Sequence, residues 1–151
     1  MHGNALFAAA DISASGLAAE RMRLEVVANN IANAFSTRSP NGGPYRRQDV
    51  VFSSVLHNSV RGTGGRGGAA PTGGVQIAGV VEDMSELHRI YNPGHPDAGS
   101  DGYVDMPNVD LPVEMVNMMT ASRAYEANLH AMQLFRQMTE QSYSIVRNQG
   151  G

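Results

Sequence analysis

The stretch "LEVVANNIANAFSTRSPNGGPYRRQDVVF", Leu24 to Phe52, predicts a change from helix to strand and decides how the chain is organised. Its first part has the apolar spacing of a helix, yet it carries three asparagines, a residue type that is unfavourable inside helices. Prolines and glycines follow, and the residue before a proline is pushed out of the helical region. We therefore expect a helix that ends before Ser36 and a strand that begins near Tyr45.

The composition excludes several classes of partner. The chain has 151 residues, 42% of them hydrophobic, and a formal net charge of −3, so no basic surface for nucleic acid or an anionic membrane is expected. With no cysteine, a disulfide framework and a thiolate metal site are excluded. The apolar run from Ala5 to Ala10 is too short for a cleaved signal peptide. No segment has the ~20 apolar residues of a membrane span.

Helical spacing covers the N-terminal region from Asn4 to about Ala34. Leu17, Leu24 and Ile31 lie seven residues apart and form one narrow apolar stripe. An isolated helix would leave this stripe in water, so the helix needs a partner helix.

The strongest periodicity lies in a second helix, which we expect to begin near Asn108 or Asp110 and to continue to about Asn148. Its apolar residues alternate steps of four and three, which is the spacing of a coiled-coil seam. The predicted seam consists of Leu111, Met115, Met118, Ser122, Tyr125, Leu129 and Met132.

Between the helices the pattern changes to that of strands. Runs at Tyr45 to Leu56 and Gly73 to Asp83, with a short run centred on Ile90 and Tyr91, predict a small antiparallel sheet. The whole chain is therefore predicted to be α+β, with long terminal helices that pair as a coiled coil around a β insert. The expected parts are an N-terminal helix at 1–35, a β insert at 36–107 with a flexible glycine-rich loop (about 61–74) and an extended connector (about 91–107), and a C-terminal helix at 108–151.

Motifs that would suggest a cofactor or a metal are weak here. The run from Gly62 to Gly67 matches Gly-x-Gly-x-x-Gly, but no helix follows it, so a flexible loop is the better interpretation. A partial EF-hand pattern beginning at Asp97 has Asn108 where the bidentate glutamate should lie. The five histidines lack the paired spacing of a zinc helix. We expect no catalytic site, cofactor or metal; nucleotide binding by the isolated chain would favour the alternative of a small enzyme.

Arg123 and Glu126 lie beside the predicted seam, within the segment Ser122 to Asn128. We expect them to pair across helices, with a solvated face as the alternative, since exposed ion pairs contribute ~0 to 1 kcal/mol. The segment contains no paired nucleophile and base, which argues against an enzyme.

The asparagines near the end of the first helix are interpreted as a device that selects one alignment of the helices. Small residues there let backbones approach while the amides offer hydrogen bonds. The candidate assembly and interhelix residues are Leu17, Leu24, Val27, Ala28, Asn29, Asn30, Ile31, Asn33, Met115, Met118, Ser122, Arg123, Tyr125, Glu126, Asn128, Leu129 and Met132.

The stretches "ANNIANAFSTRSPNGGPYRRQDVVF" and "GYVDMPNVDLPVEMVNMMTASRAYEANLHAMQLFRQM" resemble the bacterial flagellar rod proteins. The first is similar to the whole group of rod, hook and filament-junction proteins, and the second is most similar to one branch of the proximal rod. The resemblance implies a structural subunit without catalysis or cofactor, assembled helically into the driveshaft that crosses the periplasm. It also implies export through the flagellar type III apparatus without a cleaved signal.

The partners that the resemblance implies are other copies of the chain, rod proteins of the FlgB, FlgF, FlgG and FliE types, and the export apparatus. A different axial protein, such as a FlgB-like subunit or a hook-basal adaptor, is the alternative. The residues Asn108-Val109-Asp110, at the entry to the second helix, favour the branch of the proximal rod that the second stretch resembles. The chain departs from the family in the glycine-rich segment Arg61 to Gly74 and in the tail after Met138.

Overall fold

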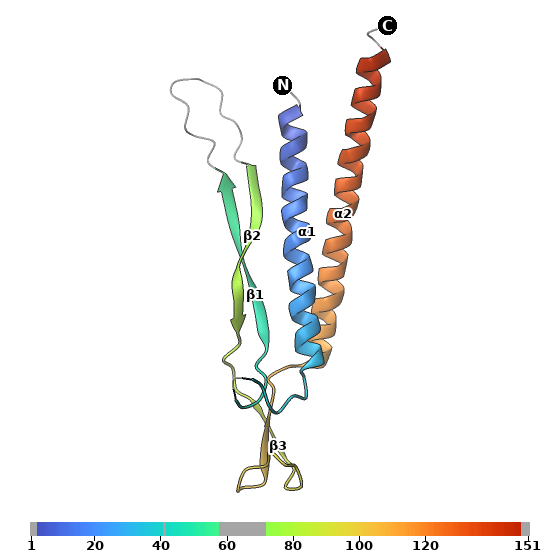
Figure 1. Cartoon of the computed structure of the whole chain (residues 1–151). Coiled ribbons are helices and arrows are strands. Elements are labelled where there is room, and N and C mark those ends of the chain that lie inside the picture. Colours follow the sequence, from blue (N-terminus) through green and yellow to red (C-terminus); the bar gives the residue numbers. More distant parts are fainter. Residues whose placement is uncertain (1–2, 41, 58–71, 149–151) are drawn as a thin grey trace.

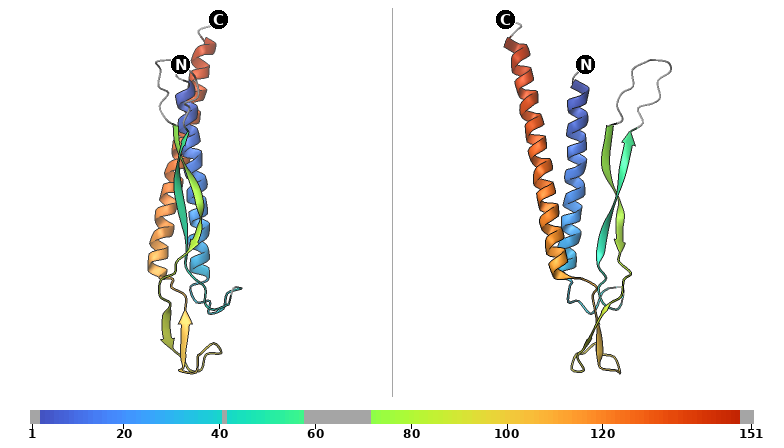
Figure 2. Two further views of the ribbon diagram at one scale, coloured as in Figure 1. Left: turned by 90° about the vertical axis from the view of Figure 1, so that its left-hand side faces the viewer. Right: turned by 180° about the vertical axis from the view of Figure 1, so that it is seen from behind.

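The computed structural model describes residues 3–40, 42–57 and 72–148 and has the predicted α+β class (Figure 1). Helix α1 spans Gly3–Ala32 and helix α2 spans Leu111–Asn148. The two helices run antiparallel and contact each other (Figures 1 and 2). In the described part of the chain, no helix is both long and apolar enough to cross a membrane.

Helix α1 ends in the asparagine-rich segment, close to the predicted boundary. The backbone N–H of Asn33 donates to the carbonyl oxygen of Asn29 at 3.0 Å, and the side-chain amide of Asn33 donates to the same oxygen at 2.9 Å. Gly42 and Gly43 then take positive φ angles of 83° and 75°, a backbone region that glycine adopts without strain. The chain thereby turns from α1 towards the first strand.

Helix α2 begins at a capping aspartate, as predicted. The carboxylate of Asp110 accepts a hydrogen bond from the backbone N–H of Val113 at 3.4 Å, and the Asp110 carbonyl accepts one from the Glu114 N–H at 2.9 Å. Pro112 lies in the first turn, where its missing N–H removes no helical hydrogen bond.

The β insert forms two separate two-stranded sheets, so the prediction of one small sheet is wrong. Strand β1 (Gln48–His57) pairs antiparallel with β2 (Thr72–Glu82), with a bulge between Val51 and Phe52. Strand β3 (His88–Tyr91) pairs antiparallel with β4 (Tyr103–Met106). The predicted extended connector therefore contains a strand, β4.

Packing around β4 explains why it forms despite the prolines and glycines before it. Val104 is 2% exposed, and the rings of Tyr91 and Tyr103 meet edge to face at 5.2 Å. Gly102 has a φ of 77°, and its carbonyl oxygen accepts a hydrogen bond from the Asn92 N–H at 3.0 Å. This turn reverses the chain and sets the register of the short sheet.

The molecule is elongated, with α1 between α2 on one side and the β1–β2 hairpin on the other (Figure 1). Both termini lie at one end, and the β3–β4 sheet lies at the opposite end (Figures 1 and 2). The core is small and is concentrated where α1 ends and α2 begins. Its buried apolar residues are Ala19, Val26, Val27, Ala34, Val50, Val104, Val109 and Ala121.

Candidate assembly site

A buried polar junction joins the end of α1, the start of β1 and the start of α2, and Asn30 lies at its centre. The Asn30 amide nitrogen donates to the Gln48 carbonyl oxygen at 2.8 Å and to a Glu114 carboxylate oxygen at 3.1 Å. The Asn30 amide oxygen accepts from the Gln48 N–H and the Tyr45 hydroxyl, both at 2.9 Å. All the hydrogen-bonding capacity of this fully buried amide is used, which explains an asparagine in a helix.

Glu114, which is 0% exposed, is the charged member of the junction. One carboxylate oxygen accepts hydrogen bonds from Arg47 Nε at 2.8 Å and from the Asn117 amide at 3.3 Å. The other accepts from Asn30. A buried carboxylate is costly unless it is paired and hydrogen-bonded, and this one is both. Glu114 is not among the candidate site residues predicted from the sequence.

The electrostatics of the junction favour a neutral tyrosine and a charged arginine. Burial raises the pKa of the Tyr45 hydroxyl, and the negative charges of Glu114 and Glu82 raise it further. Burial opposes the charge on Arg47, but the hydrogen bond and the charge of Glu114 outweigh this effect and raise the pKa of Arg47. Tyr45 therefore serves as a hydrogen-bond donor, and Arg47 as a permanent cation.

Asn108, which is 8% exposed, extends the junction to the end of β2. Its side-chain oxygen accepts a hydrogen bond from the Arg47 backbone N–H at 2.9 Å. Its amide donates to the Asp83 carbonyl oxygen at 3.0 Å and to Ser85 Oγ at 2.8 Å. Of the two predicted caps of the second helix, Asp110 thus takes that role, whereas Asn108 hydrogen-bonds to the segments just before β1 and just after β2.

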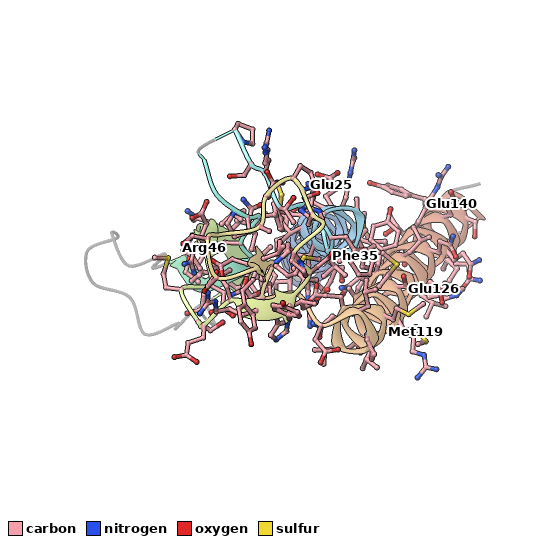
Figure 3. All side chains as sticks on the ribbon, turned by 90° about the horizontal axis from the view of Figure 1, so that it is seen from below. Glu25, Phe35, Arg46, Met119, Glu126 and Glu140 are labelled. Atoms are coloured by element: carbon pink, nitrogen blue, oxygen red, sulfur yellow. The ribbon has the colours of Figure 1, made fainter. Side chains whose placement is uncertain are left out.

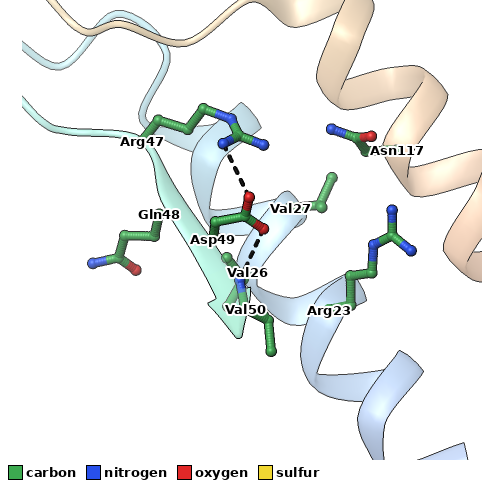
Figure 4. Close-up of a pocket in the computed structure, with 8 residues that line it drawn as sticks. All are labelled: Arg23, Val26, Val27, Arg47, Gln48, Asp49, Val50 and Asn117. Atoms are coloured by element: carbon green, nitrogen blue, oxygen red, sulfur yellow. Dashed lines mark hydrogen bonds and ion pairs between the residues drawn. The ribbon is translucent and has the colours of Figure 1, made fainter. Parts of the chain in front are cut away.

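A small recess adjoins the junction between α1, β1 and α2 (Figure 4). Its volume is about 70 Å³, far below the roughly 300 Å³ of the smallest usual ligand sites. The Asp49 carboxylate lies beside it, 3.4 Å from Arg47 Nη1, and accepts a hydrogen bond from the Val50 N–H at 2.9 Å (Figure 4). The residues lining the recess are Arg23, Val26, Val27, Arg47, Gln48, Asp49, Val50 and Asn117.

A second polar contact ties the segment after α1 to the turn between β3 and β4. One Asp97 carboxylate oxygen accepts a hydrogen bond from Thr37 Oγ1 at 2.8 Å, and the other accepts one from Arg38 Nε at 2.6 Å. These two donors lower the pKa of Asp97. The acidic residues of the rejected EF-hand pattern are engaged in ion pairs instead, since Asp101 also accepts a hydrogen bond, from Arg89 Nη2 at 2.6 Å. In residues 3–40, 42–57 and 72–148, no group of three metal-binding side chains occurs.

Close backbone approach fixes the middle of α1 between its two neighbours. A Cβ atom added to Gly16 would lie 2.9 Å from the Asn128 amide nitrogen on α2. On the other side, the Val75 N–H of β2 donates to Ser15 Oγ at 3.1 Å, and a Cβ added to Gly74 would lie 3.1 Å from that oxygen. Ser15 and Gly16 are not predicted as contact residues from the sequence, because a small residue in a helix is common and gives little signal.

The structure places the predicted N-terminal residues at different depths within the single chain. Val27 and Asn30 are buried, whereas Ala28 and Asn29 are exposed. The residues of intermediate exposure are Leu17, Leu24, Ile31 and Asn33.

The face of α2 that packs on α1 is rotated from the predicted seam. Glu114 and Ala121 are both 0% exposed and lie seven residues apart, and Asn128 continues the series. Met115 is 58% exposed and Leu129 is 39% exposed, so these two contribute little to the contact within the chain. The predicted residues of intermediate exposure are Met118, Ser122, Tyr125, Asn128 and Met132.

Arg123 and Glu126 are exposed, and neither forms an ion pair with another described residue of the chain. Their predicted pairing across helices, and the assembly contacts of the remaining seam residues, stay predictions. The Gly62 to Gly67 motif and the flexible loop predicted around it lie outside the described residues, apart from the part of the loop that belongs to β2.

The fold and the junction are those of an elongated chain held together by buried polar contacts. The polar groups of the junction hydrogen-bond to one another and to backbone, and the adjoining recess is too small for a substrate. Two family descriptions match the chain: "Flagella basal body rod protein" at residues 11–38 and "Flagellar basal body rod FlgEFG protein C-terminal" at residues 100–145. These matches cover parts of both helices.

Curated relatives match over nearly the whole chain. A flagellar basal-body rod protein FlgC of Borreliella burgdorferi is 39% identical, covering 94% of this chain and 98% of the relative. FlgC of Salmonella typhimurium is 44% identical over 85% of this chain and 88% of its own length. FlgC of Bacillus subtilis is 39% identical over 92% of this chain and 97% of its own length. The chain belongs to the FlgC family of flagellar basal-body rod proteins and is a structural subunit of the rod.

Proposed function

We propose that the chain polymerises helically through its terminal helices in the proximal rod, and that the resulting driveshaft transmits motor torque to the hook. The observation that carries this proposal is the exposed apolar surface of α2. Val116, Met119 and Leu134 are each more than half exposed, although α2 also packs on α1. A helix that is apolar on more than one side is suited to burial among several neighbours.

The antiparallel contact of α1 and α2 supports the finer proposal that the helices pair as a coiled coil. The buried residues Glu114 and Ala121 and the half-buried Asn128 follow the seven-residue repeat of such a pair. A stiff helix pair is also a suitable element for a shaft, because torque is carried along packed helices rather than along loops.

Other features of the proposal rest on family membership. The chain acts without catalysis, in the rod where it crosses the periplasm, and reaches it through the flagellar type III export apparatus without a cleaved signal. Its partners are other copies of itself and rod proteins of the FlgB, FlgF, FlgG and FliE types. The descriptions of its relatives as basal-body rod proteins support this assignment.

The proposal is tested in a bacterium that lacks its own copy of this gene. The chain should restore swimming and should be present in purified hook-basal bodies. Leu24→Asp should abolish both, because burying an unpaired charge costs several kcal/mol. Met84→Asp is the control, since Met84 is 74% exposed and lies outside both helices. Normal motility with Leu24→Asp would contradict assembly through the helices.

A further inference from the structure

We infer that the outward face of α2 binds α1 of a neighbouring copy of this chain, and that the neighbouring copy is displaced along the helix axis. This inference rests on the proposed function and specifies the interface between copies. The face, here called the outer seam of α2, is exposed along the whole helix. Its members follow steps of three, four and seven, so they lie on one side. They are Val113, Val116, Thr120, Ala127, Leu134, Met138 and Ile145.

The outer seam is suited to burial against another helix without water between the two. Val116, Leu134 and Ile145 are 59%, 59% and 57% exposed, although their side chains are apolar. Thr120 also fits, because its hydroxyl already donates to the Val116 carbonyl oxygen at 2.8 Å and so has an acceptor within its own helix. Arg123 borders this face and has no ion-pair partner among the described residues.

The exposed side of α1 has the complementary form, and we call it the outer stripe of α1. Its members also alternate steps of four and three, and most are alanine, so a large side chain of another helix can approach closely. Arg21 and Glu25 form an exposed ion pair at 3.1 Å in its middle. The outer stripe consists of Ala14, Ala18, Arg21, Glu25, Ala28 and Ala32. Figure 3 shows Glu25 on α1 and Glu126 on α2 at the outside of the molecule.

Contacts within the chain fix how the two helices are aligned. Asn30 contacts Glu114, and Gly16 lies against Asn128, so 14 residues of α1 match 14 residues of α2 in antiparallel order. In this alignment Arg21 lies level with Arg123. If a neighbouring copy lay at the same height, its Arg123 would therefore oppose Arg21, and like charges in contact are unfavourable.

A displacement of the neighbour by four residues, about 6 Å at 1.5 Å per residue, removes this conflict. Arg123 then lies level with Glu25 of the other copy, and Glu126 comes near Arg21. Large residues of the outer seam meet small residues of the outer stripe in the same alignment. The facing pairs are Ala14 with Leu134, Arg21 with Ala127, Glu25 with Arg123, Ala28 with Thr120, and Ala32 with Val116.

The contact joins two different faces and includes an axial displacement, so repeating it does not close a ring. Such head-to-tail contacts generate open helical assemblies. The charge pair thus selects a displaced neighbour over a level one, and the helical form of the polymer follows from the alignment of two helices.

Charge reversal tests the pairing of Glu25 with Arg123. The experiment uses cells in which the unsubstituted chain restores swimming, and that restoration is the separate test of the proposed function. Arg123→Glu should give about tenfold fewer complete basal bodies, because it replaces an ion pair with repulsion from Glu25 at every joint. Glu25→Arg combined with Arg123→Glu should recover most of the loss. Arg136→Glu is the control: Arg136 lies on the same helix off the outer seam, is 83% exposed, and pairs only with the exposed Glu140 of the next turn, a contact of little energy. Normal assembly with Arg123→Glu, or no recovery in the double variant, would overturn the pairing.

Cross-linking tests the displacement independently, because the natural chain has no cysteine. Ala28→Cys with Thr120→Cys should give covalent dimers and longer multimers, at multiples of the chain mass, after oxidation of purified basal bodies, because each copy carries both cysteines. Ala28→Cys with Val116→Cys represents the level alignment and should give far fewer dimers. More dimers from the second pair than from the first, or none from either pair, would contradict the displaced interface.

Discussion

At the scale of single residues, Glu114 bears on stability because three elements depend on its charge. Glu114→Ala would take one acceptor from the buried Asn30 amide and leave the half-buried Arg47 with only Asp49 and Asp83 as ion-pair partners, which should cost about 1 to 3 kcal/mol. Glu114→Gln keeps the shape and one acceptor, so its cost should be smaller. Urea unfolding of the purified chain, followed by helical circular dichroism, measures both. Equal stability of the two variants and the unsubstituted chain would show that the junction contributes little.

Asp97 predicts a dependence of stability on acid pH. Hydrogen bonds from Thr37 and Arg38 lower its pKa below the ordinary value of 3.8. Its contribution to stability is therefore complete above that value and is lost as the pH falls through the lowered pKa.

The variant for this test is Asp97→Asn, which cannot ionise. The difference in unfolding free energy between the natural chain and Asp97→Asn should be constant above about pH 5 and should shrink below about pH 4. Urea unfolding at a series of pH values measures it, with Glu126→Gln as the control at an exposed carboxylate without an ion-pair partner in the described chain. A difference that grows towards acid pH would contradict the assigned role of Asp97.

The same residues show what sequence reasoning can reach at this scale. The asparagines near the end of α1 were expected to select an alignment, and Asn30 does bind across to α2 through Glu114. The partners Tyr45 and Gln48 could not be foreseen, because nothing local indicates which backbone groups a buried amide will meet. A glutamate in the first turn of a helix is already favoured by the helix dipole, so the sequence gives no separate sign that Glu114 is buried.

At the scale of elements, the separation of α1 and α2 depends on Gly16. Gly16→Leu should destabilise the chain by about 1 to 3 kcal/mol, because the added side chain would overlap Asn128 and push the helices apart. Asn128→Ala should relieve part of this loss, since the amide is the obstructing group. Thermal unfolding of both single variants and the double variant gives the coupling energy. Additive effects would show that the two residues do not contact.

The elements themselves were largely predictable, and the errors have physical causes. Both helices follow their apolar periods, and strands β1, β2 and β3 lie in the predicted runs of aromatic and β-branched residues, features that depend on local sequence. Strand β4 has only four residues, and the Tyr91 ring that packs on its Tyr103 comes from strand β3, so local rules missed it. The predicted seam of α2 followed its largest apolar residues, whereas the contact with α1 uses Glu114 and Ala121.

At the scale of the whole molecule, buried contacts are distributed unevenly along its length. Buried residues gather where α1 ends and α2 begins, as with Asn30, Glu114 and Ala121. Towards the opposite end, Ile12 of α1 is 43% exposed, and Tyr143 of α2 is 70% exposed. The 38 residues of α2 also extend further than the 30 residues of α1, by about 12 Å at 1.5 Å per residue. The far end of α2 therefore has little to pack against in a single chain.

This gradient predicts how a dilute monomer exchanges its amide hydrogens. Val26 to Asn30 and Glu114 to Ala121 should exchange slowly, because opening them breaks the junction, whereas residues 138–145 should exchange quickly. In purified basal bodies residues 138–145 should become protected, since neighbouring copies would cover Met138 and Ile145. Glu114→Ala should speed exchange at the junction without changing the already fast end. Equal, strong protection along all of α2 in a confirmed monomer would show that the helix is stable without neighbours, and that assembly adds contacts without adding order.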